Sequence, residues 1–215
     1  TCIHLYNLSE NNSFDLAKTL EAVESKFGHL FQNIEWLNLG GGHLITDSRY
    51  DVEYLISLLK NLKQRYPHLN IIMEPGSAFT WQTGVLVATV NDIVENDDVK
   101  TAMLNVSFAC HMPDTLEMPY KPKIRNAYQE PIADKPTYRM GGNSCLSGDF
   151  LGDWSFDKPL KVGDNLIFED MMHYTTVKTT MFNGVSHPSI GLWTADDKFV
   201  LYRDFNYNDY KNRMS

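Results

Sequence analysis

Three consecutive glycines, Gly40, Gly41 and Gly42, lie in the stretch "LNLGGGHL" at residues 37–44. A run of glycines costs backbone entropy on folding, so the missing Cβ atoms must bring some gain. A tight turn from a strand to a helix needs one glycine and occasionally two. A loop whose bare N–H groups bind a phosphate near a helix N-terminus is the other explanation. The spacing leaves both open, because the stretch is neither GxGxxG nor a Walker loop.

A carboxylate follows another apolar run, in "NIIMEPGS" at residues 70–77. Pro75 and Gly76 hold Glu74 at a sharply turning strand end. Glu74 could cap a nearby N–H group. It could instead keep a pyridine nitrogen protonated on a phosphate-bearing cofactor, so that the ring acts as an electron sink.

The segment "ACHMPDTLEMPY" at residues 109–120 places Cys110, His111, Asp114 and Glu117 within eight positions. It is either a polar loop between strands or a Pro-stiffened loop whose carboxylates bind an amine-bearing substrate. A zinc site would need more His or Cys at ligand spacing, so we predict no metal here.

Two further segments contain polar groups of interest. In the glycine-rich stretch at residues 141–157, Cys145, Asp149 and Asp153 either belong to a turn-rich connector or handle a proton and an ammonium group. The spacing of the aspartates is only a weak indication of calcium. Residues 169–184 alternate like a strand, and the polar exceptions are His173, Tyr174 and Asn183.

The elements that must position these groups alternate between strand and helix in the first part of the chain. We predict strands at residues 2–8, 34–39 and 70–77, and helices at residues 13–30 and 51–66. Ser13 is the expected N-cap of the first helix and Gly28 its stop. Strict alternation implies parallel βα units, in which the chemistry lies at the C-terminal ends of the strands. His4, the three glycines and Glu74 fall at those ends.

After residue 83 the chain is rich in strand patterns. These cover residues 84–96, 99–110, 164–171 and 199–205, with hairpin or loop signals at "ENDD", "VGDN" and "ADDK". No long helical pattern returns before the last few residues. We therefore divide the chain into a βα segment, residues 1–82, and an all-β domain, residues 83–215.

Composition excludes some functions. The net charge of −8 and the pI of 5.3 argue against a surface for nucleic acid or anionic membrane. No apolar run reaches the length needed to span a membrane. Cys2, Cys110 and Cys145 are odd in number and lack metal-like spacing, which indicates free thiols in a reducing, cytoplasmic setting.

Five collinear stretches together resemble the carboxynorspermidine decarboxylases, a family of fold-type III pyridoxal-phosphate (PLP) enzymes related to ornithine and diaminopimelate decarboxylases. They are "LNLGGGH", "EPGSAF", "ACHMPDTLEMPY", "SCLSGDFLGD" and "HYTTVKTTMFNG". The resemblance covers essentially the whole chain. It implies the C-terminal part of a PLP-binding (β/α)8 barrel followed by a β-sandwich or barrel-like domain. It also implies a homodimer with shared active sites and decarboxylation of carboxynorspermidine or carboxyspermidine in polyamine biosynthesis.

The same resemblance implies roles for individual residues. The cofactor would contact Gly40, Gly41, Gly42, Glu74, Gly76, Tyr174 and His4. In this scheme the glycines and Tyr174 hold the phosphate, and Glu74 binds the pyridine nitrogen or lies close to the substrate. The residue that stacks on the ring is His4 by its chemistry or Tyr6 by the register of the alignment.

Substrate and catalytic roles come from the later motifs. Cys145 and Asp149 resemble residues donated across the dimer interface, with Cys145 as the proton donor after loss of CO2. Asp114, Glu117 and His111 would face the distal amines of the substrate.

Two departures from the family accompany these roles. Ser77 stands where the broader family has an arginine that contacts the phosphate. The family's Schiff-base lysine is expected upstream, because Lys18, Lys26, Lys60 and Lys63 fall on helix faces. We therefore expect this sequence to be a C-terminal portion and catalytically incomplete as written.

Three alternatives stay open. The same scaffold could decarboxylate diaminopimelate, ornithine or arginine, although the "CHMPD" and "CLSGD" stretches argue against this. A non-catalytic PLP-binding homologue would also lack the lysine. The third alternative is a sugar-binding β-domain with an α/β appendage.

Overall fold

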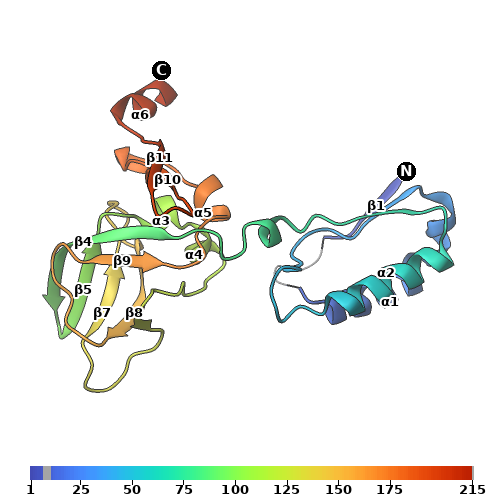
Figure 1. The fold of residues 1–215 in the computed structure, drawn as a ribbon, viewed down its shortest axis with the longest axis horizontal. Helices are drawn as coiled ribbons and strands as arrows, with labels where there is room; N and C mark the ends of the chain where they lie inside the picture. Colours follow the sequence, from blue (N-terminus) through green and yellow to red (C-terminus); the bar gives the residue numbers. More distant parts are fainter. Residues whose placement is uncertain (7–10, 215) are drawn as a thin grey trace. The chain divides into compact units, whose positions relative to one another are not determined.

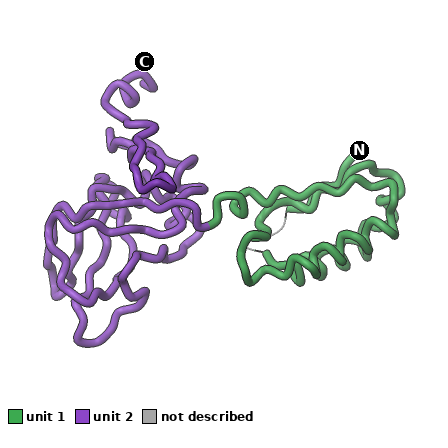
Figure 2. Tube along the Cα trace, in the orientation of Figure 1, with its two compact units in different colours: residues 1–81 green, residues 82–215 purple. Residues whose placement is uncertain are grey.

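The computed structural model describes residues 1–6 and 11–214, and the chain forms two compact units, residues 1–81 and 82–215 (Figure 2). The predicted strand at residues 2–8 therefore lies partly outside the described residues. Each unit has a hydrophobic core of its own. Within the described part of the chain, no helix combines the length and the apolar character that crossing a membrane requires.

Unit 1 is a three-stranded parallel sheet, in the order β1-β2-β3, with two helices on one face. Its elements are β1 (Cys2–His4), α1 (Ser13–Phe27), η1 (Gly28–Asn33), β2 (Trp36–Asn38), α2 (Val52–Arg65), β3 (Asn70–Ile72) and η2 (Gly76–Phe79). The two helices lie side by side (Figure 1). Leu16 and Leu20 of α1, Leu62 of α2 and Leu37 of β2 are buried in one core. The predicted parallel βα arrangement is confirmed.

The predicted cap of the first helix is wrong by one residue. Asn12, not Ser13, is the N-cap of α1, and its side chain accepts a hydrogen bond from the Asp15 N–H at 2.9 Å. Ser13 is instead the buried first residue of the helix. Gly28 does follow the last helical residue, but its φ of −56° is right-handed, so the chain continues into η1 without a left-handed stop.

Unit 2 is built on a six-stranded sheet in the order β6-β8-β7-β5-β4-β9. Its elements are β4 (Leu86–Asn96), β5 (Val99–Leu104), α3 (Phe108–His111), α4 (Asp114–Glu117), β6 (Ala127–Tyr128), β7 (Thr137–Gly141), β8 (Phe150–Phe156), β9 (Asn165–Phe168), α5 (Tyr174–Val177), η3 (Phe182–Gly184), β10 (Ile190–Trp193), β11 (Phe199–Arg203) and α6 (Tyr207–Met214). Strands β10 and β11 form a separate two-stranded sheet.

The two ends of the six-stranded sheet are joined to each other. Ile124, just before β6, forms an isolated antiparallel bridge with Phe168 of β9. The Arg125 backbone N–H donates to the Ile167 carbonyl at 2.9 Å. The side chains of Arg125 and Glu169 form an ion pair, in which Nε lies 2.7 Å from Oε1. We call residues 123–125 and 167–169 the seam. The seam curls the sheet into the barrel-like form that the sequence predicts.

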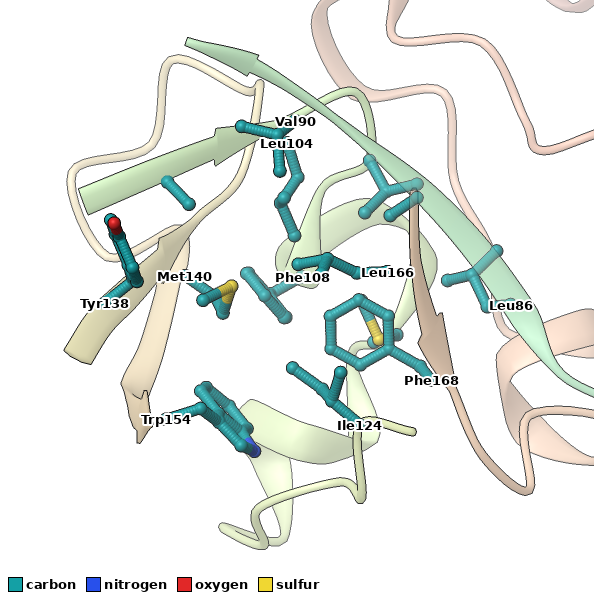
Figure 3. Close-up of a cluster of buried hydrophobic side chains, with 14 of the residues drawn as sticks. Leu86, Val90, Leu104, Phe108, Ile124, Tyr138, Met140, Trp154, Leu166 and Phe168 are labelled. Atoms are coloured by element: carbon teal, nitrogen blue, oxygen red, sulfur yellow. The ribbon is translucent and has the colours of Figure 1, made fainter. Parts of the chain in front are cut away.

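The curled sheet encloses the core of unit 2. The side chains of Phe108, Ile124, Met140, Trp154 and Phe168 point toward one another from one helix, one loop and three strands (Figure 3). All five are fully buried. Short helix α3 thus contributes directly to the core through Phe108.

Several sequence-based boundaries in unit 2 need correction. The predicted strand at 99–110 ends at Leu104, because the Ser107 hydroxyl caps α3 by accepting from the Cys110 N–H at 2.9 Å. The strand-like alternation at 169–184 is wrong: this segment forms α5 and η3, and Asn183 has a left-handed φ of 53° that no strand contains. The residues 109–120 are not an open loop, since α3 and α4 fill most of them.

Two hairpin signals and the terminal helix are confirmed. At "ENDD", Asp97 and Asp98 have left-handed φ values of 45° and 64° and connect β4 to β5. At "ADDK", Asp197 has a φ of 63° between β10 and β11. The last few residues form α6.

Replacing Phe168 with alanine tests the core of unit 2. We expect Phe168→Ala to lower the free energy of unfolding by about 3–5 kcal/mol, because a fully buried ring is removed from a closed sheet. Phe199→Ala is the matched control, since Phe199 is 60% exposed, and should change stability far less. Urea unfolding measures both. Equal losses would contradict the assignment of the core.

Candidate functional site

Three polar side chains meet at the C-terminal ends of the parallel strands in unit 1. His4 ends β1, Asn38 ends β2, and Glu74 follows β3. Asn38 Nδ2 donates to Glu74 Oε1 at 2.6 Å, and His4 Nε2 lies 3.8 Å from Glu74 Oε2. Asn38 was not among the site residues predicted from the sequence. Its position at a strand end, two residues before Gly40, is the signal that identifies it.

The glycine loop packs against the Glu74 backbone. Gly40 and Gly42 have left-handed φ values of 72° and 82°, which favour glycine. A Cβ on Gly41 would lie 2.6 Å from the Glu74 carbonyl oxygen, and the Glu74 N–H donates to the Gly40 carbonyl at 2.8 Å. Gly40 and Gly42 are therefore required by their left-handed backbone and Gly41 by its close approach to Glu74. A simple turn would need only one or two glycines.

The expected helix N-terminus is not next to this loop. Helix α2 begins only at Val52, and the Asp51 carboxylate already caps it by accepting from the Tyr54 N–H at 2.8 Å. Within residues 1–6 and 11–214, no acceptor takes the N–H hydrogen of Gly41 or Gly42. The loop backbone itself, rather than a helix dipole, offers the donors for an anion.

These strand ends fit a phosphorylated pyridine cofactor. The loop N–H groups suit phosphate oxygens, and the Glu74 carboxylate, oriented by Asn38, suits a protonated ring nitrogen. His4 lies beside this carboxylate, whereas Tyr6 is 92% exposed. Gly76 begins η2, and no atom would contact a Cβ placed on it.

In unit 2, the acidic residues expected to face a substrate amine already bind an amine of this chain. Lys178 Nζ donates to Asp114 Oδ1 at 2.5 Å and to Glu117 Oε2, and it lies 5.8 Å from the centroid of the Tyr174 ring. The hydrogen bond to Asp114 raises the pKa of Lys178 above its usual range, and the hydrogen bond to Glu117 is the second largest cause of this shift. Lys178 was not among the predicted site residues, because its segment has the alternation of a strand and the sequence does not show that it returns to Asp114.

Asp149 organises the loop that contains Cys145. Its carboxylate is buried, with Asp149 only 4% exposed, and accepts hydrogen bonds from the Ala109 N–H at 2.9 Å and the Ser144 N–H at 3.0 Å. A Cβ on Gly142 would lie 2.3 Å from Asp149 Oδ2. Both carboxylate oxygens are thus used within the fold. Asp153 does not join this group, because it pairs with Arg139, with Nε and Oδ1 3.0 Å apart.

Cys145 and Tyr174 are accessible, as a catalytic or binding role requires. The Cys145 side chain is exposed, and its sulfur accepts a hydrogen bond from Asn183 Nδ2. Tyr174 opens α5 and is half-exposed, with the ring of His173 6.0 Å from its own. Cys110, by contrast, is buried.

His111 is buried and does not face solvent. It is 1% exposed, and its Nδ1 accepts a hydrogen bond from the Ser107 N–H at 3.1 Å. Burial lowers the pKa of His111 to about 4, so the ring is neutral at pH 7. The expected contact between His111 and the distal amines is therefore not supported by its position. The ring lies at the end of α3, close to Ser186 and His187.

Comparison with known proteins identifies the family. Residues 6–172 match the family described as pyridoxal-dependent decarboxylase, C-terminal sheet domain. The chain belongs to this family. The pyridoxal-dependent decarboxylase fold and cofactor class expected from the motifs are thereby confirmed.

Individual relatives within the pyridoxal-dependent decarboxylases are similar over nearly all of the chain. It is 56% identical to carboxyaminopropylagmatine decarboxylase of Synechocystis sp. over 97% of its length, and 42% identical to carboxynorspermidine/carboxyspermidine decarboxylase of Campylobacter jejuni over 98%. These matches cover 54% and 57% of the relatives, so the chain spans little more than half the length of the curated relatives it matches.

A solved structure agrees with this assignment. The crystal structure of carboxynorspermidine decarboxylase complexed with norspermidine, from Campylobacter jejuni, matches with a TM-score of 0.87 at 42% identity. The match covers 99% of this chain and 60% of that one. The arrangement of strands and short helices described above is thus that of a pyridoxal-dependent decarboxylase.

Removing the Lys178 ammonium tests the acidic cluster. We expect Lys178→Met to lower the free energy of unfolding by about 1–2 kcal/mol, because the largely buried Asp114 loses its cation while the exposed Glu117 loses little. Lys178→Arg should retain most of the stability. Lys198→Met, at an exposed pair with Asp196, is the matched control and should be near neutral. An unchanged urea midpoint in Lys178→Met would contradict the role of this ammonium.

The buried His111 makes stability depend on pH. Below pH 6.5 the unfolded chain binds a proton at His111, whereas the folded chain does so only near pH 4, so stability should fall as the pH drops from 6.5 to 4. The Asn side chain of His111→Asn still offers an acceptor for the Ser107 N–H but binds no proton in this range. The free energy of unfolding of this variant should therefore fall by up to about 3 kcal/mol less than that of wild type between pH 6.5 and pH 4. Urea unfolding across this range measures it, with His29→Asn, at an exposed histidine, as the control. Parallel pH profiles for wild type and His111→Asn would be evidence against the buried neutral ring.

Proposed function

We propose that the protein is a PLP-dependent carboxy-lyase acting on carboxylated polyamines. The observation that supports this most is the similarity, over 97% or more of the chain, to two decarboxylases named for such substrates. The motifs alone indicate carboxynorspermidine and carboxyspermidine. The relative at 56% identity is named for carboxyaminopropylagmatine, so the proposed substrate class includes all three.

In this proposal unit 1 binds and orients the cofactor, and residues 1–82 are one part of a PLP-binding (β/α) barrel. The N–H groups of Gly41 and Gly42 bind phosphate oxygens, with Gly40 and Gly76 shaping the approach, and Glu74 holds the ring nitrogen protonated. Asn38 fixes the Glu74 carboxylate through a 2.6 Å hydrogen bond. His4 contacts the ring from beside Glu74. When bound, PLP supplies an electron sink for the pair released as the carboxylate leaves.

The residues of unit 2, the C-terminal β domain at 83–215, supply the remaining chemistry in a homodimer with shared active sites. Cys145 donates a proton to the substrate carbon that has lost CO2, Asp149 holds the Cys145 loop, and Tyr174 donates its O–H to the phosphate. Asp114 and Glu117 present two negative charges against the single charge of Lys178. The excess negative charge favours a polycationic substrate. The three free cysteines, Cys2, Cys110 and Cys145, support a reducing, cytoplasmic location in this proposal.

Decarboxylation of diaminopimelate, ornithine or arginine is the alternative on the same fold, and a non-catalytic PLP-binding homologue is the second. An assay of the full-length protein with PLP separates them. We expect CO2 release from carboxyaminopropylagmatine, carboxynorspermidine or carboxyspermidine, with much lower kcat/KM for diaminopimelate, ornithine and arginine. Preference for one of the shorter amino acids would replace the proposed substrate class. PLP binding without turnover of any substrate would favour the non-catalytic homologue.

Replacing Cys145 tests the proposed proton donor. In the full-length protein, Cys145→Ala should lower kcat by roughly 100-fold while PLP affinity is retained, because a positioned general acid contributes about that factor. Cys2→Ala, at the other exposed thiol, is the matched control and should leave kcat unchanged. Unchanged turnover of Cys145→Ala would remove Cys145 from the mechanism.

A further inference from the structure

We propose that Asn183 is a positioning residue that aims the Cys145 thiol and stabilises its thiolate. The inference rests on the proposed function, in which Cys145 is the proton donor. Its basis is the hydrogen bond from Asn183 Nδ2 to Cys145 Sγ, which joins two residues 38 positions apart in the chain.

The segments of Cys145 and Asn183 are anchored independently on the same short helix, α3. On the Cys145 side, the buried Asp149 carboxylate binds the N–H groups of Ala109 in α3 and Ser144 next to the cysteine. On the Asn183 side, the Thr180 N–H donates to the carbonyl of Cys110 in α3 at 2.9 Å. The sulfur and the amide are thus brought together by two separate connections to one element.

The backbone at Asn183 restricts which residue can make this contact. Its φ of 53° is left-handed, and the next residue, Gly184, has a φ of 79°. Non-glycine residues in this region are mainly asparagine and aspartate. Of these, only asparagine offers an N–H donor to the sulfur, because an ionised aspartate is acceptor-only. The position therefore combines a backbone requirement with a donor requirement.

Transfer of the Cys145 proton to the substrate leaves a negative charge on sulfur, and the Asn183 amide can stabilise this charge. When Cys145 protonates the substrate carbon, the S–H bond breaks, a C–H bond forms, and the negative charge moves to sulfur. A hydrogen bond from Asn183 Nδ2 favours that charged form. Because Cys145 is exposed, the thiolate regains its proton from water before the next turnover.

Two substitutions keep the left-handed backbone while removing the donor, namely Asn183→Asp and Asn183→Gly. In the full-length protein we expect each to lower kcat by roughly 10-fold or more, since a hydrogen bond to a charged group is lost, with KM and PLP affinity unchanged. In a Cys145→Ala background neither should have any further effect on kcat, because the two residues act as a unit. A kcat loss that persists in that background would overturn the proposal.

A second measurement does not depend on turnover. Alkylation of Cys145 by iodoacetamide, followed by peptide mapping against Cys2 in the same molecule, should slow several-fold in Asn183→Asp. Asn143→Asp is the matched control, because the Asn143 amide lies in the Cys145 loop but donates to the Asn105 carbonyl at 3.2 Å. Equal alkylation rates in wild type and Asn183→Asp would overturn the proposal. If no carboxylated polyamine is turned over but alkylation slows as expected, the proposed function fails and the link between Asn183 and Cys145 stands.

Discussion

The buried carboxylate of Asp149 is the interaction on which the polar part of unit 2 depends. A helix as short as α3 has no stability of its own, because the first turn costs more than its hydrogen bonds return. Asp149 compensates for this by accepting the N–H of Ala109, while the Ser107 hydroxyl caps the same helix. Gly142 leaves the space that the carboxylate needs. The Cys145 loop, the Asn183 turn and the buried His111 ring all take their positions from α3.

The parts of the fold that follow from local patterns could be predicted from the sequence. Apolar spacing identified both long helices of unit 1, and the stretches "ENDD" and "ADDK" identified the hairpins after β4 and β10. The glycine loop and Glu74 were correctly placed at strand ends, because parallel strands bring their C-terminal ends to one edge. Asn38 was not predicted as a site residue, because hydrophobic periodicity does not mark it and its only signal is its place at a strand end just before the glycines.

The short helices of unit 2 could not be predicted, because tertiary contacts rather than propensity determine them. Helix α5 occupies a segment whose alternation is that of a strand, and its Lys178 reaches back across more than sixty residues to Asp114. A sequence shows the two carboxylates of Asp114 and Glu117 but not the ammonium that neutralises them. For the same reason the burial of His111 could not be anticipated from its polar neighbours.

The seam of unit 2 has a consequence for how the domain avoids misassembly. Open sheets end in strands whose unpaired N–H and C=O groups can recruit a strand from another molecule. Here the backbone N–H and C=O groups of residues 123–125 are hydrogen-bonded to those of residues 167–169, and the side chains of Arg125 and Glu169 form an ion pair beside them. Intermolecular strand addition at this site would first have to open the seam. Protection against edge-to-edge aggregation is thus a property of the closed ring itself.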